Sequence, residues 1–111
     1  MSIRERIKAI QKDLRDGALT PDLARESLVT LTALMGNCND EIREADADYA
    51  TVLLSFLQGD EAANRARIRA ETTPAYQRKR EARDAKELVI ELCRSLKYLL
   101  KAKEEEMRLT R

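Results

Sequence analysis

The stretch that decides the fold lies at residues 24–56, ARESLVTLTALMGNCNDEIREADADYATVLLSF, and carries apolar or small side chains at alternating intervals of four and three residues. These positions are Ala24, Leu28, Leu31, Met35, Cys38, Ile42, Ala45, Tyr49, Val52 and Phe56. The spacing averages about 3.5 residues, so one continuous stripe runs along a helix and must be buried against another helix. The pattern predicts a long helix with a single apolar seam.

Signals for the beginning and end of helices flank this stretch. Thr20 is suited to cap a helix that has Pro21 at its first position, and Gly17 is suited to end the helix before it. The chain is therefore expected to form helices at about 3–16, 21–58 and 75–111, with a basic helical segment at about 61–71. The apolar stripe stays in phase across Gly36, which favours a continuous second helix. Residues 61–71 could extend the second helix, form a helix of their own or join the last one.

Composition points to a single all-α domain. The chain has 111 residues, 37% of them charged, with only three glycines and two prolines, which is typical of long helices. We expect a short N-terminal helix and a long, coiled-coil-like antiparallel hairpin.

We also expect the chain to be oligomeric, because one hairpin would leave part of its apolar surface exposed. The side chains expected to remain exposed in a monomer are Leu34, Leu53, Leu54, Leu57, Leu88, Cys93 and Leu100. The predicted partner or oligomer interface consists of Leu31, Met35, Cys38, Ile42, Tyr49, Val52, Phe56, Leu88, Val89, Leu92, Leu96 and Leu99.

The sequence contains no constellation typical of an enzyme. It has no histidine, the commonest general base and metal ligand, and its glycines stand alone at positions 17, 36 and 59. No catalytic residue, metal, cofactor or small-molecule substrate is expected. Without an apolar run long enough to cross a bilayer or a targeting signal, the protein is expected in the cytoplasm, away from membranes, with Cys38 and Cys93 reduced.

Two clusters of opposite charge could bind partners. The acidic one spans residues 40–48 and is interpreted as a solvated helix face or as a docking site for a basic partner. The basic one is the candidate nucleic-acid site, formed by Arg65, Arg67, Arg69, Tyr76, Arg78, Lys79, Arg80 and Arg83. Arginine suits phosphate, and a tyrosine can stack on a base. The alternatives are a solvated surface, pairing with acidic residues across a dimer, or an acidic protein partner.

The layout of the chain also resembles a class of viral proteins. The likeness covers about residues 24–109 and rests on Ala45–Ala50, Asn64–Arg67 and the terminal run from Ser95. In these features the chain resembles small all-helical proteins of tailed bacteriophages and prophages, found among recombination and single-strand-handling genes. The resemblance implies a bacterial host cell and a setting near DNA. Two functions are therefore expected: a DNA-binding accessory of phage recombination, or an adaptor or inhibitor that binds a phage or host protein.

Overall fold

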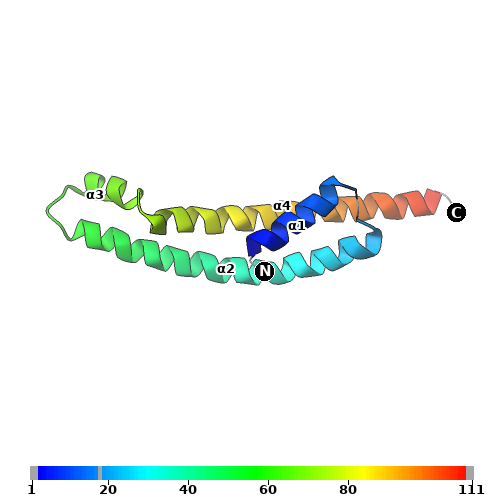
Figure 1. The fold of residues 1–111 in the computed structure, drawn as a ribbon, viewed down its shortest axis with the longest axis horizontal. Helices are drawn as coiled ribbons and strands as arrows, with labels where there is room; N and C mark the ends of the chain where they lie inside the picture. Colours follow the sequence, from blue (N-terminus) through cyan, green and yellow to red (C-terminus); the bar gives the residue numbers. More distant parts are fainter. Residues whose placement is uncertain (1–2, 18, 110–111) are drawn as a thin grey trace. The chain divides into compact units, whose positions relative to one another are not determined.

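The computed structural model describes residues 3–17 and 19–109, and these form four helices and no strand (Figure 1). The helices are α1 (Ile3–Arg15), α2 (Pro21–Leu57), α3 (Ala63–Ala70) and α4 (Pro74–Leu109). The predicted all-α class is confirmed. The first, second and last helices each begin within one residue of the predicted position, and the first and second also end within one residue of it. The predicted end of the last helix, at residue 111, lies outside the described residues.

The local signals at the start of the chain act as predicted. Gly17 has a φ of +66°, the left-handed conformation that a residue without a Cβ adopts most easily. The backbone N–H of Leu23 donates to Oγ1 of Thr20 at 3.3 Å, which caps α2. The helix then runs without interruption through Gly36, so the predicted continuity is confirmed.

The chain forms two compact units, to which α2 and α4 both contribute. Unit 1 comprises residues 1–36 and 85–111, and unit 2 comprises residues 37–84. The core of unit 1 draws on all three of its helical segments. Its buried side chains are Ile7, Ile10, Ala24, Leu31, Leu34, Val89, Leu92 and Leu96.

Unit 2 has a core of smaller side chains. Cys38, Ala45 and Tyr49 are buried on α2, together with Ala66 and Ala70 on α3 and Ala82 on α4. Alanines at the contacts allow helix backbones to approach closely. Across the two units, every position of the apolar stripe of α2 is buried or partly buried, as the spacing predicts.

The structure decides among the three arrangements that the sequence left open for residues 61–71. The region forms its own short helix, α3, and buries Ala66 and Ala70 completely, although its sequence suggests no apolar face. The helix α3 begins at Ala63 and has no side-chain cap. Just before α4, the Thr73 hydroxyl donates to the carbonyl of Ala70 at 2.6 Å.

Fewer of the apolar side chains expected at the surface are exposed than the sequence predicts. Leu34 is 1% exposed. The expectation considered only the two long helices, whereas unit 1 also contains α1. Leu54, Leu57 and Leu88 are exposed as expected. Leu53, Cys93 and Leu100 are partly buried.

Most of the predicted interface is packed inside a single chain. Leu31, Cys38, Tyr49, Val89, Leu92 and Leu96 are buried. Met35, Ile42, Val52, Phe56 and Leu99 are partly buried. Of the twelve residues, Leu88 is the exposed one, at 41%. The burial of this stripe therefore requires no second copy.

Two further findings concern the cysteines and the helices of the described residues. Neither Cys38 nor Cys93 forms a disulfide in the described part of the chain. None of the helices described is both long enough and apolar enough to cross a bilayer.

Candidate interaction surface

The acidic and basic clusters singled out in the sequence meet in unit 2. Glu41, Glu44 and Asp48 follow one another at intervals of three and four residues, so they share one face of α2. Arg78 of α4 lies against this face. Its Nε donates to Glu41 at 3.0 Å and its Nη2 to Glu44 at 3.4 Å. Its Nη1 donates to Asp48.

Arg78 therefore uses each of its three guanidinium nitrogens within the chain. The planar group offers donors in several directions, which allows one arginine to bind three carboxylates. The hydrogen bond to Glu41 is the main cause that raises the pKa of Arg78 above its ordinary value. The charge of this arginine is therefore balanced by carboxylates of the same unit.

Two further arginines of the predicted nucleic-acid site have acidic partners. Arg83 donates to Oδ2 of Asp46 at 2.7 Å. Arg69 pairs with Glu61 and also lies over the ring of Phe56, with its Cζ 5.2 Å from the ring centroid. Three of the seven basic residues in that site are thus committed to carboxylates of unit 2.

The aromatic residue of the predicted site is also occupied. The rings of Tyr76 and Tyr49 lie 5.3 Å apart at an angle of 48°, and Nζ of Lys79 is 4.6 Å from the centroid of Tyr49. Burial is the main cause that raises the pKa of Tyr49, and the charge of Glu71 adds to it. Both Tyr76 and Lys79 are therefore partly engaged in packing around Tyr49.

The hollow beside Tyr76 is more acidic than basic. It has a volume of about 380 Å³ and is lined by Glu71, Tyr76, Gln77, Arg80, Glu81 and Asp84. Three carboxylates and one guanidinium border this hollow, which a base stacked on Tyr76 from this side would enter. Such a lining repels the phosphates attached to that base.

The remaining arginines lie on the exposed surface. Arg65 and Arg67 of α3 and Arg80 of α4 are exposed and have no ion-pair partner within 4.0 Å among the described residues. On α3, Ile68 lies opposite the buried alanines and is 64% exposed, with Arg65 and Arg67 on either side of it. We call these three residues the outer face of α3.

The net charge of unit 2 is negative despite its arginines. Residues 37–84 contain eight arginines and lysines and ten aspartates and glutamates, a net charge of −2. A surface of this sign does not attract nucleic acid from a distance. The outer face of α3 is instead a small apolar and basic patch on an acidic unit.

The sequence indicated both charged clusters and offered their pairing across a dimer as one alternative, whereas the structure pairs them within one chain. The missed residue is Ile68, whose exposure follows once the alanines four residues apart are recognised as the buried face of α3. Comparison with protein-family models, with curated proteins and with solved structures found no match to this chain.

Proposed function

We propose that this protein is a non-enzymatic helical adaptor that binds another protein, of a phage or of its host, through the outer face of α3. The observation that carries the proposal is the pairing of Arg69, Arg78 and Arg83 with carboxylates of the same unit. It commits three of the seven basic residues that the predicted phosphate-binding site would use. On α3, one exposed isoleucine remains between two arginines.

This patch suits a partner of defined chemistry. Arginines flanking an apolar side chain are typical of protein interfaces, where the apolar residue is desolvated and the arginines bind carboxylates at the rim. The partner is therefore a protein surface with an apolar pocket bordered by aspartate or glutamate.

The proposal includes the arrangement and location of the protein. Within unit 1, Arg25 pairs with Glu104 at 3.5 Å, and within unit 2, Arg83 pairs with Asp46. In both units α2 and α4 are in contact, and their lengths of 37 and 36 residues match. These observations support one antiparallel hairpin. The resemblance to phage proteins supports the cytoplasm of a bacterial host cell.

Site-specific photo-crosslinking in bacterial cells tests the adaptor function. A photoreactive residue replaces Ile68 in one variant and Val29 in the other, because Val29 is also well exposed, at 71%, but lies in unit 1. We expect a discrete protein adduct from position 68 only, which disappears when Arg65 and Arg67 are changed to glutamate. Equal adducts at both positions, or an adduct that survives those changes, would contradict the proposal.

Nucleic-acid binding stays the second candidate function. It is favoured by Arg65, Arg67 and Arg80, whose exposed guanidinium groups have no carboxylate partner among the described residues. If these arginines bind phosphate, their replacement by glutamine weakens binding for all base sequences and flattens its salt dependence.

A further inference from the structure

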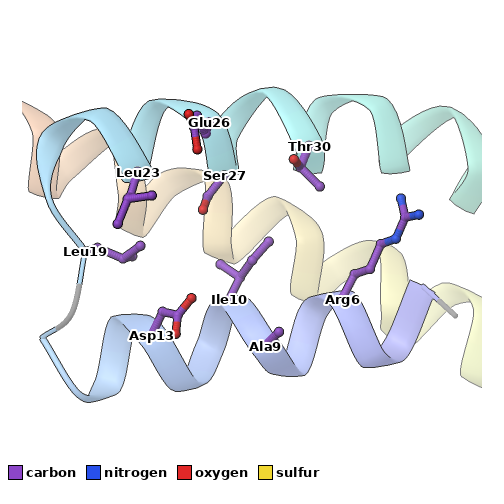
Figure 2. A pocket seen from close by; sticks show the side chains of 9 residues that line it. All are labelled: Arg6, Ala9, Ile10, Asp13, Leu19, Leu23, Glu26, Ser27 and Thr30. Carbon is purple, nitrogen blue, oxygen red and sulfur yellow. The ribbon is translucent and has the colours of Figure 1, made fainter. Parts of the chain in front are cut away.

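A groove in unit 1 shares no residue with the outer face of α3. It has a volume of about 410 Å³ and lies between α1 and the first turns of α2 (Figure 2). The residues that line it are Arg6, Ala9, Ile10, Asp13, Leu19, Leu23, Glu26, Ser27 and Thr30. Ala9 and Ile10 of α1 face Ser27 and Thr30 of α2 in its middle, and its charged groups lie toward the ends.

The two ends of the groove carry opposite charges. Figure 2 shows Arg6 toward one end and Asp13 with Glu26 toward the other, with Ala9 and Ile10 between them. None of the three charged side chains has an ion-pair partner within 4.0 Å in the part of the chain that the structure describes. Both charges are thus available to a partner.

The residues that α1 contributes to the groove form a symmetric set. Positions 6, 9, 10 and 13 are related by reversal about a point between Ala9 and Ile10. If two copies of α1 lie antiparallel and centred on this point, Arg6 of each copy faces Asp13 of the other. A twofold axis brings each residue into the same contact twice, so one set of residues can form both halves of an interface.

We infer that this groove is a docking site for a second copy of the same chain, joined by a twofold axis at the middle of α1. Arg6 of one copy binds Asp13 and Glu26 of the other, and the reverse pair forms at the opposite end. Ala9 lies at the centre of the contact, where its small side chain allows the two helices to approach. Leu23, which is 45% exposed, adds apolar surface next to Leu19 at the end that holds Asp13 (Figure 2).

The arrangement of charge favours a second copy over other occupants. A nucleic acid or a uniformly acidic segment would be attracted by Arg6 and repelled by the two carboxylates. A uniformly basic segment would meet the opposite problem. An occupant must carry both charges at the matching separation, and α1 itself meets this requirement. The inference is independent of the adaptor function, which rests on unit 2.

Charge reversal tests the contact in the full-length protein. Sedimentation equilibrium from micromolar to millimolar concentration measures the mass of the wild type and of Arg6→Asp, Asp13→Arg and Lys8→Asp. The last variant is the control, because it makes the same charge change on an exposed position of α1 that does not line the groove. Circular dichroism and thermal melting check that each variant is folded.

We expect the wild type and Lys8→Asp to form dimers. Arg6→Asp and Asp13→Arg should each weaken the dimer by about tenfold or more, because Arg6→Asp turns all four attractive pairs of the dimer into repulsive ones and Asp13→Arg turns two of them. An equimolar mixture of these two variants should recover the dimer, since the new carboxylate at position 6 then faces arginine at position 13.

Three results would overturn the inference. The first is a wild-type mass of one chain at every concentration. The second is a dimer that Arg6→Asp affects no more than Lys8→Asp does. The third is a mixture of folded variants that fails to recover the dimer. Because none of these changes touches α3, a failure here leaves the crosslinking result at position 68 unaffected.

Discussion

Truncation of Leu96 tests the packing of α4 in unit 1, and Leu88 provides a matched control. Both are leucines in the same helix and the same unit, but Leu96 is fully buried whereas Leu88 is 41% exposed. Leu96→Ala removes three buried carbon groups, which is about 2.4 kcal/mol at about 0.8 kcal/mol each. The cavity left behind adds to this loss, at about 24 cal/mol per Å³ that does not collapse.

We therefore expect Leu96→Ala to lower the free energy of unfolding by about 3–5 kcal/mol. Leu88→Ala should lower it by about 1 kcal/mol, because much of the deleted surface already contacts water. Urea titrations followed by far-ultraviolet circular dichroism measure both values. An unchanged slope of the unfolding free energy against urea concentration indicates that the variants unfold in the same single transition as the wild type. Equal losses for the two variants would refute the assignment of Leu96 to the core.

Three further predictions concern individual contacts. Thr20→Ala should lower the free energy of unfolding by about 1 kcal/mol, measured by urea titration, while Thr20→Ser should change it little. Because burial raises the pKa of Tyr49 above its ordinary value of 10.0, the unfolded chain loses this proton first, and stability falls as the pH rises above that value. Thermal melts in alkaline buffers should show a smaller fall for Tyr49→Phe than for the wild type or for Tyr98→Phe, since Tyr98 is 77% exposed. Arg78→Gln should lower the melting temperature more at low salt than at high salt, because three carboxylates then face one another. Arg80→Gln should show no such salt dependence, and a similar response of both variants would contradict the role of Arg78.

The helices could be predicted because their signals are local. The stripe from Ala24 to Phe56 fixes one buried face, and its phase shows that the second helix continues through Gly36. Thr20, Pro21 and Gly17 mark helix ends through backbone chemistry that depends on a few neighbouring residues.

The pairing of charges could not be predicted from spacing alone. Arg78 and its partner Glu44 are 34 residues apart, so their contact depends on how the helices of unit 2 pack. The sequence shows a row of arginines and a row of carboxylates but not which faces meet. Ala66 and Ala70 were missed for a related reason, because alanine is a strong helix former on any face of a helix and its burial depends on tertiary contact.

The proposed adaptor function requires that the arginines of unit 2 serve the fold and a protein contact rather than phosphate binding. Titration of fluorescently labelled single-stranded and double-stranded DNA with the wild-type protein at low salt, followed by anisotropy, tests this directly. We predict no saturable binding, because unit 2 has a net charge of −2 and Arg69, Arg78 and Arg83 are paired with carboxylates. Saturable binding that weakens steeply with salt, and that Arg65→Gln and Arg67→Gln reduce, would contradict the account.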